Sequence, residues 1–191
     1  MSPRTAEQFK EIRKGKKEII LNSALEIFAE QGFHGASISK IAQHANISKG
    51  LIYNYFESKE DLLKEIIFNG LDEMFVFFDP NHDGKLTKDE CIYFINEIFK
   101  LISENCKFWK LYFSVLAQPV VLKLIEKKLT ERIIPMLKML ENYYIDKGVE
   151  EPYVKARLVT AILDGVGMHY IVDPKGFPLE ETKKIIIDKF V

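Results

Sequence analysis

The chain has 191 residues, of which 47% are hydrophobic and 29% charged, and its formal net charge is −1. This composition is ordinary for a globular protein and sufficient for a buried core. Its two cysteines, Cys91 and Cys106, argue for a reducing environment and against a disulfide framework. No charged leader precedes an apolar run, and no run approaches the roughly 18 residues of a membrane span, so we expect a cytoplasmic protein with no membrane contact.

Apolar residues recur at helical spacing along almost the whole chain, and no convincing strand alternation is present, so we predict an all-α protein. Gly32 should stop the first helix, and Pro135 should kink the long seventh one. Ser58 and Asp61 form a capping pair that supports the start of the fourth helix. The predicted helices span residues 11–31, 39–45, 49–56, 58–78, 87–104, 107–116, 119–146, 151–171 and 179–190.

The amino end is cationic. Within residues 1–17, only Glu7 and Glu11 oppose a larger group of cations, namely Arg4, Lys10, Arg13, Lys14, Lys16 and Lys17. A local excess of this kind is what a DNA-binding surface needs, whatever the net charge of the whole chain. A solvated terminus would have the same composition, and the sequence leaves both interpretations open.

Residues 35–56 contain two short predicted helices separated by a tight turn, which is the pattern of a helix-turn-helix. Asn46 lies in the turn, where we expect a positive φ that Asn tolerates nearly as well as Gly. Ser48 is placed to cap the second helix, so that Lys49, Tyr53 and Asn54 point outward. The alternative is an αα-hairpin within a core, which has the same spacing.

The outward residues have the chemistry of a recognition helix in the major groove. Lys49 can donate to guanine or to phosphate, and Asn54 can hydrogen-bond base edges or phosphate. Tyr53 and Tyr55 can contact phosphate or a thymine methyl group. Lys59, in the first turn of the next helix, adds a charge beside the positive end of that helix's dipole.

This stretch resembles the TetR-family signature. Positions agree in register from residue 37 to residue 63, at Ile41-Ala42, Ile47-Ser48-Lys49-Gly50, Ile52-Tyr53, Tyr55-Phe56, Ser58-Lys59 and Leu62-Leu63, and Ala24, Phe28 and Gly32-Phe33 precede them as expected. Two positions depart from the signature, because Ser37 replaces the more usual Thr and Asn46 the more usual Gly. Beyond about residue 65, only the number and lengths of the helices agree.

The resemblance implies a homodimeric transcriptional repressor that reads the half-sites of a palindromic operator. It implies a DNA-binding domain over residues 1–58 and a ligand-binding and dimerisation domain over residues 59–191, in which an unknown small-molecule effector shifts the fourth helix. An activator with the same fold is an alternative that the sequence does not separate from a repressor. Carried over by position, the DNA contacts are Ser37, Ser48, Lys49, Gly50, Tyr53, Asn54, Tyr55 and Lys59.

Residues 79–90 match a second motif, the EF-hand calcium loop, with Gly84 at its sharp turn. The alternative is a capping box between Thr87 and Glu90 after an ordinary turn, and Glu90 cannot serve both. A single loop with three acidic ligands predicts modest affinity. The resemblance implies Ca²⁺ ligands from the side chains of Asp79, Asn81 and Asp83, the Lys85 carbonyl, Thr87 directly or through water, and a bidentate Glu90.

The second half of the chain is rich in aromatic residues, most of which we expect in the core, because such stripes more often pack than bind. Family pockets are nevertheless built from these helices. Small and aliphatic residues at 159–168, including Gly165 and Gly167, favour close approach of another helix. As the resemblance implies, we assign the helices at 151–171 and 179–190 to the homodimer interface. The candidate pocket residues are Phe78, Phe94, Phe108, Trp109, Tyr112, Tyr143 and His169.

Other classes of function are less well supported. The four His, two Cys and scattered carboxylates show no nucleophile, metal-hydrolase or phosphate-cradling arrangement, so we expect no enzymatic activity. The principal alternative is a calcium-responsive helical sensor that binds partner proteins and carries a vestigial helix-turn-helix. This alternative predicts weak, salt-sensitive DNA binding with no preferred sequence.

Overall fold

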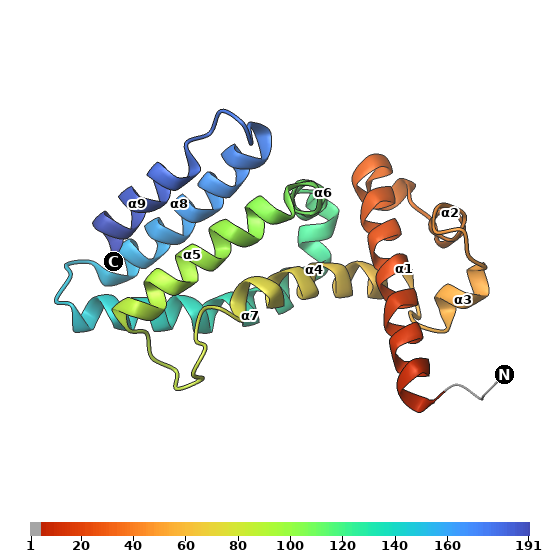
Figure 1. Ribbon diagram of the computed structural model, residues 1–191, viewed down its shortest axis with the longest axis horizontal. Helices are drawn as coiled ribbons and strands as arrows, with labels where there is room; N and C mark the ends of the chain where they lie inside the picture. The colour runs from red at the N-terminus through yellow and green to blue at the C-terminus, as the bar shows by residue number, and fades with distance from the viewer. Residues whose placement is uncertain (1–4) are drawn as a thin grey trace. The chain divides into compact units, whose positions relative to one another are not determined.

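The computed structural model describes residues 5–191, with Ala6 described in its backbone only, and this part of the chain contains helices and no strand (Figure 1). The all-α prediction is therefore confirmed. The helices are α1 (Ala6–Gly35), α2 (Ile38–His44), α3 (Lys49–Tyr53), α4 (Lys59–Phe75), α5 (Lys88–Glu104), α6 (Cys106–Leu116), α7 (Pro119–Asp146), α8 (Pro152–Val172) and α9 (Leu179–Phe190).

The described chain divides into two packed units. The first contains residues 5–69 together with 114–124, and the second contains residues 70–113 and 125–191. Three helices, α4, α6 and α7, therefore run from one unit into the other. The boundary that we predicted after residue 58 is a division by function, and it stays a prediction.

Helix α1 begins five residues earlier than its apolar pattern predicts, because a capping box holds its first turn. The Thr5 hydroxyl accepts a hydrogen bond from Gln8 N at 3.3 Å, and the Gln8 amide oxygen accepts from Thr5 N at 3.0 Å. Gly32, the predicted end of this helix, breaks it with a non-helical φ of 71°. One further turn follows the break and ends at Gly35. Ile20, Ala24 and other α1 residues form the core of the first unit.

The α2–turn–α3 segment has the local geometry that the sequence predicts. Asn46 adopts a φ of 52° in the turn, which confirms the left-handed conformation. The Ser37 and Ser48 hydroxyls cap α2 and α3 by accepting from Lys40 N at 3.3 Å and Leu51 N at 3.2 Å. Ile52 is fully buried, which fixes the orientation of the short α3 against the core.

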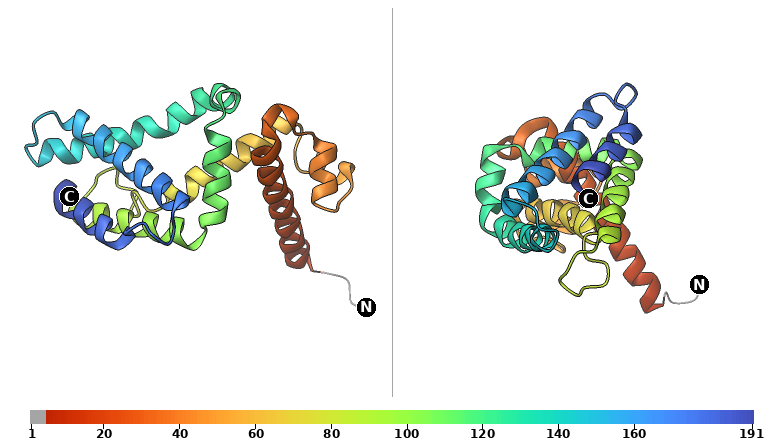
Figure 2. Two further views of the ribbon diagram at one scale, coloured as in Figure 1. Left: turned by 90° about the horizontal axis from the view of Figure 1, so that it is seen from above. Right: turned by 90° about the vertical axis from the view of Figure 1, so that its left-hand side faces the viewer.

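In the second unit, α5, α8 and α9 pack side by side (Figure 2). Gly167 of α8 explains the close approach to α5, because a Cβ at this position would lie 3.2 Å from Ile102 Cδ1. The Tyr143 and Tyr144 hydroxyls of α7 donate to Val191 O at 3.0 Å and Phe190 O at 2.8 Å. These bonds hold the end of α9 against α7.

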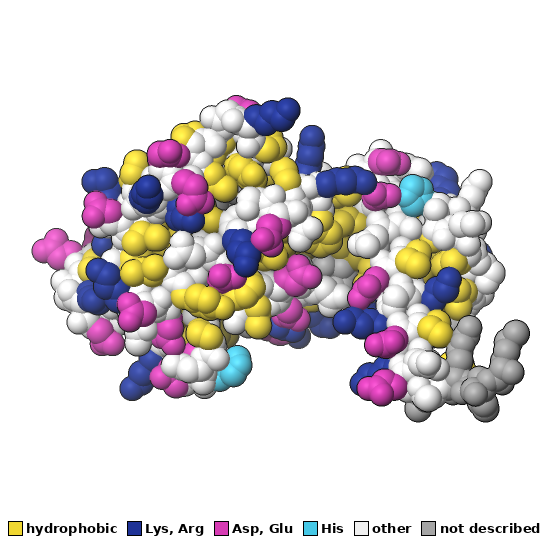
Figure 3. Space-filling model, viewed as in Figure 1, with side chains coloured by type: hydrophobic (Ala, Val, Ile, Leu, Met, Phe, Trp, Pro, Cys, Tyr) yellow, Lys and Arg dark blue, Asp and Glu magenta, His cyan; other side chains and the backbone are white. Residues whose placement is uncertain are grey.

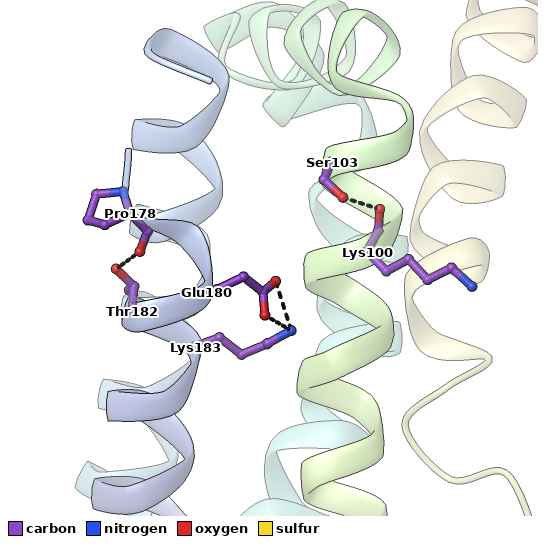
Figure 4. A network of polar contacts seen from close by, with 6 residues as sticks. All are labelled: Lys100, Ser103, Pro178, Glu180, Thr182 and Lys183. Carbon is purple, nitrogen blue, oxygen red and sulfur yellow. Dashed lines mark hydrogen bonds and ion pairs between the residues drawn. The ribbon is translucent and has the colours of Figure 1, made fainter. Parts of the chain in front are cut away.

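The start of α9 is fixed by local polar contacts (Figure 4). The Thr182 hydroxyl donates to Pro178 O at 2.8 Å, and the Lys183 ammonium pairs with Glu180 at 2.8 Å while pointing toward α5. On the face shown in Figure 3, cationic and anionic side chains are interspersed over the second unit. No single described helix is long and apolar enough to cross a membrane. The pair α6 and α7, which is bent at its junction, is long and apolar enough when length and composition alone are counted.

Candidate nucleic-acid interface and internal cavity

Helix α3 presents a row of exposed residues on one face. Lys49, Gly50, Tyr53 and Asn54 are all exposed, and Tyr53 is exposed to 50%. Gly50, Tyr53 and Asn54 follow Lys49 by one, four and five residues, and this spacing places them together on the helix surface. The Lys49 ammonium lies 5.9 Å from the centre of the Tyr53 ring, so these side chains form one patch. This patch can offer a cation, an amide and a phenol to a flat or grooved partner.

The two capping serines keep a free hydrogen-bonding capacity. Ser37 is half-buried and Ser48 is exposed, and each hydroxyl oxygen accepts from a backbone N–H. A serine hydroxyl that accepts in this way still has its own proton to donate. The capping role is therefore compatible with the predicted DNA contacts of both residues, which stay predictions.

Lys59 has a structural role that the sequence did not indicate. Its ammonium donates to Phe33 O at 2.7 Å and to Ala36 O at 3.0 Å, and it lies 4.4 Å from the centre of the Phe33 ring. Two of its three N–H donors therefore hold the end of α1. A phosphate contact by Lys59 stays a prediction, but this ammonium already serves the packing of the first unit.

A cationic face of α1 extends this surface and was absent from our predicted site. Three cations follow Lys10 at spacings of three, four and seven residues, namely Arg13, Lys14 and Lys17. This spacing places all four on one side of the helix. Arg13 lies 5.2 Å from the centre of the Tyr55 ring, which connects this face to the end of α3. The helical spacing of these cations was a signal that the sequence contained. Arg4 lies outside the described residues.

Gln118, between α6 and α7, is a second residue that the sequence analysis missed. Its amide oxygen accepts from Phe33 N at 2.8 Å, and its amide nitrogen donates to Phe28 O at 3.0 Å. The side chain thus bridges the backbone on both sides of the break at Gly32. No local pattern indicates such a contact, because the partners are about 85 residues away along the chain.

The second unit contains a cavity of about 350 Å³. Its lining comes mainly from apolar residues of α4, α5, α7 and α8. Of the predicted pocket residues, Phe78 and Phe94 line it, with their rings 5.0 Å apart. The other predicted residues are not in its lining: Phe108, Trp109 and Tyr112 form an aromatic cluster behind the cavity-lining Phe113, Tyr143 bonds to Val191, and His169 stacks on Phe177.

Two charged residues of α8, Arg157 and Asp164, also line this cavity, and both are exposed at its edge. Partial burial raises the pKa of the Asp164 carboxyl above its ordinary value, and the nearby Arg157 charge opposes this shift. On the buried side, desolvation raises the pKa of the Cys91 thiol to about 12, so the thiol is neutral at pH 7.

The loop between α4 and α5 has a compact hydrogen-bonded geometry. His82 and Gly84 both adopt positive φ, at 58° and 76°. Asp79 Oδ2 accepts from Gly84 N at 3.1 Å, and Asp83 Oδ1 accepts from Lys85 N at 2.8 Å. The loop side chains therefore turn inward toward their own backbone.

The capping box that we gave as the alternative for this loop is present. Glu90 Oε2 accepts from Thr87 N at 2.8 Å, and the Thr87 hydroxyl accepts from Glu90 N at 3.2 Å. The Asn81 amide nitrogen donates to Glu90 Oε1 at 2.8 Å. In contrast, Asp79 Oδ1 is buried and has no hydrogen-bond partner. Among residues 5–191, no three His, Cys, Asp or Glu side chains are placed to hold a metal ion.

Comparisons with known proteins agree with this geometry. Residues 20–66 match the profile of the bacterial regulatory proteins, tetR family. The HTH-type transcriptional regulator BetI of Vibrio vulnificus (strain YJ016) is 25% identical over 182 residues, covering 92% of this chain and 90% of that protein. The negative transcriptional regulator IcaR of the Staphylococcus epidermidis icaADBC biofilm operon is 27% identical over 107 residues, 56% of each chain.

A solved structure extends the likeness to the whole fold. The transcriptional regulator FadR from Bacillus subtilis, crystallised with stearoyl-CoA, superposes with a TM-score of 0.71 at 20% identity. The superposition covers 91% of this chain and 97% of FadR. The capped α2–turn–α3 unit and the exposed row on α3 have the geometry of a helix-turn-helix. The chain is therefore similar to the tetR family over residues 20–66 and similar to FadR in its fold.

Proposed function

We propose that the protein is a sequence-specific DNA-binding transcriptional repressor. The exposed row on α3 supports this function best, because it combines a cation, an amide and a phenol on a rigidly anchored helix. The cationic face of α1 adds charge for phosphate contacts. The similarity to IcaR, described as a negative regulator, favours repression over activation.

Selection of bound sequences from a random duplex pool tests this function. We expect a palindromic consensus for the wild-type protein and an altered consensus for Asn54→Ala, because a side chain that reads bases determines the preferred sequence. Glu57→Ala is a matched control, since Glu57 is exposed just beyond the α3 row. Weak, salt-sensitive binding with no consensus would instead support the calcium-responsive sensor that binds partner proteins.

We propose that the repressor is a homodimer formed through α8 and α9. Val154, Leu158, Met168 and Val172 lie along one face of α8 and are 45–80% exposed. Gly165 lies on the same face, with no atom within 4 Å of the position of a Cβ, so a helix can approach closely there. Ile185 of α9 is also exposed. A row of exposed aliphatic side chains of this kind favours a helix-packing partner.

We also propose that a small-molecule effector binds in the second unit and controls DNA binding. The cavity offers a largely apolar site there. FadR, which shares the fold, was crystallised with stearoyl-CoA, a molecule with a long apolar chain. Release of the selected operator duplex on titration with candidate effectors tests this part of the proposal.

Finally, we propose that the loop at 79–90 binds Ca²⁺. The buried, unpaired Asp79 Oδ1 favours this function, because an oxygen without a donor is available to a cation. Binding would require Glu90 to leave its capping bond and the Asn81 amide to present its oxygen. The proposed ligands are Asp79, Asn81, Asp83, the Lys85 carbonyl, Thr87 and Glu90.

Calorimetric titration of the full chain with Ca²⁺ tests this site. We expect a saturable heat that is lost in Asp79→Ala and kept in Asp89→Ala, because Asp89 lies in the same segment but outside the proposed ligand set. No heat at millimolar Ca²⁺ would sink this proposal and leave the capped loop as a structural turn. The repressor function does not depend on the outcome.

A further inference from the structure

The cavity of the second unit has a deep apolar part. Phe78, Ile95, Ile98 and Leu137 are all at least nine-tenths buried and line it from α4, α5 and α7 or their ends. Its volume of about 350 Å³ falls within the range of about 300–1,000 Å³ for small-molecule sites. Because an apolar wall offers water no hydrogen bonds, such a cavity favours an apolar occupant.

The lining residues with polar side chains differ in what they leave available to a ligand. Tyr144 donates its hydroxyl proton to Phe190 O, and Thr160 donates its own to Arg157 O at 2.9 Å. The Cys91 thiol is neutral and buried. The Arg157 and Asp164 charges attract each other, since Arg157 lowers the pKa of Asp164, but within residues 5–191 neither side chain has a hydrogen bond or ion pair. These two groups are therefore available to a ligand.

Arg157 and Asp164 carry opposite charges on the same side of α8. Their backbone positions are seven residues apart, or roughly 10 Å along the helix at about 1.5 Å per residue, and their charged ends lie within electrostatic reach of each other. A head group with a net charge placed between them is attracted by one residue and repelled by the other. An uncharged head that both donates and accepts can bond to Asp164 and Arg157 at once. Because both residues are exposed, this head would lie at the edge of the cavity.

We propose that the cavity binds a neutral amphiphile, with its apolar body among the buried side chains and an uncharged amide or alcohol head between Arg157 and Asp164. The inference rests on the proposed function, in which this ligand is the effector. It adds the chemical class of that effector. Free carboxylates and free amines of equal chain length do not belong to this class.

Displacement of a bound fluorescent probe tests the inference on the full chain. The protein is loaded with N-phenyl-1-naphthylamine and titrated at pH 7 with decan-1-ol, decanamide, decanoate and decylamine. We expect the alcohol and the amide to displace the probe at roughly tenfold lower concentration than the two ions, because one unfavourable charge costs about as much as one charged hydrogen bond. Equal or tighter binding of decanoate or decylamine would overturn the inference.

Two variants make the charge argument specific. Arg157→Gln removes the cation and should improve displacement by decylamine relative to decanoate, and Asp164→Asn should change the ratio in the opposite direction. Both residues are exposed, so folding should be preserved, and thermal unfolding checks this. Ile98→Trp, which fills the buried part, should abolish probe binding. Unchanged ratios in both charge variants would also overturn the inference.

The operator duplex separates this inference from the proposed function. If the neutral ligands bind with the expected selectivity but leave operator binding unchanged, the effector function fails and the ligand class stands. If the operator is released by a ligand that does not displace the probe, the effector function stands and the cavity is not its site.

Discussion

Lys59 shows how one side chain can take a role that its position in the sequence does not indicate. In the sequence it is a cation in the first turn of a helix that follows a recognition helix, and this position favours a phosphate contact. In the structure its ammonium instead caps Phe33 O and Ala36 O at the end of α1. The contact depends on the packing of α4 against α1, which a local pattern does not specify.

This contact leads to a prediction that separates stability from DNA binding. Lys59→Ala should lower the free energy of unfolding by about 1–2 kcal/mol, because two carbonyls lose a charged donor and the site is half-buried. Lys49→Ala, on exposed α3, should change stability by less than about 0.5 kcal/mol and weaken operator binding instead. Denaturant unfolding of both variants without DNA is the measurement. Wild-type stability in Lys59→Ala would show that the ammonium has no structural role.

Other residue-level features were predictable because their causes are local. Asn46 was expected to have a positive φ from its place in a tight turn, and Ser48 was expected to cap from its place before a helix. In both cases a side chain and its own neighbouring backbone decide the conformation. Gln118 was not predictable, because its two partners come from α1.

At the scale of the element, helix limits set by strong local signals were predicted well. The predicted and observed limits of α7 are both 119–146, with Pro119 in the first turn. Other limits differ by several residues, and two of them show that capping and turn geometry outweigh apolar spacing. Helix α1 starts at Ala6, after its capping box, and α3 ends at Tyr53, where Asn54 N bonds to Leu51 O at 3.2 Å in a tighter turn.

The cationic face of α1 gives a prediction about salt dependence. The double variant Lys10→Ala/Lys14→Ala should bind the same consensus more weakly, with a slope of log K against log salt reduced by about 2, because each lost phosphate contact removes about one unit. The double variant Lys138→Ala/Lys183→Ala, in the second unit, is the control and should keep the wild-type slope. Filter-binding or anisotropy titrations across salt concentrations measure this. An unchanged slope would favour the solvated-terminus interpretation.

Gln118 gives a second prediction at this scale. Gln118→Ala leaves Phe33 N and Phe28 O without their present partners, which should cost about 1–3 kcal/mol and loosen α1 around Gly32. Amide hydrogen exchange of residues 28–36 should become faster in this variant. Ser103→Ala is a matched control, since its hydroxyl bonds only to Lys100 O within α5 (Figure 4). Unchanged exchange at 28–36 would mean that the bridge does not hold the helix end.

At the scale of the whole molecule, the sequence predicted a pocket in the second half of the chain, where the cavity lies, but not which residues form that cavity. The candidate pocket residues are mostly aromatic, although we expected most aromatic residues in the core, and most of the cavity wall consists of aliphatic side chains from α4, α5, α7 and α8. Trp109 and Tyr112 are instead among the most buried residues of the chain. A stripe of large apolar residues has the same pattern whether it fills a core or lines a space, and only the packing of several helices distinguishes the two.

The assembly gives the last prediction. Leu158→Asp places a charge in the middle of the exposed apolar face of α8, so it should dissociate the proposed dimer at micromolar concentration, because a buried unpaired charge is strongly unfavourable. The folded protomer should be unaffected, since Leu158 is half exposed and contributes little to the core. Tyr153→Asp, at an exposed position on a different side of α8, is the matched control. Sedimentation velocity measures the oligomeric state, and operator titration measures the consequence for DNA binding.

Because a palindrome needs two linked α3 helices, the monomer should keep contact with a half-site but lose most of its affinity for the full operator. A Leu158→Asp dimer with wild-type operator affinity would place the interface on another surface.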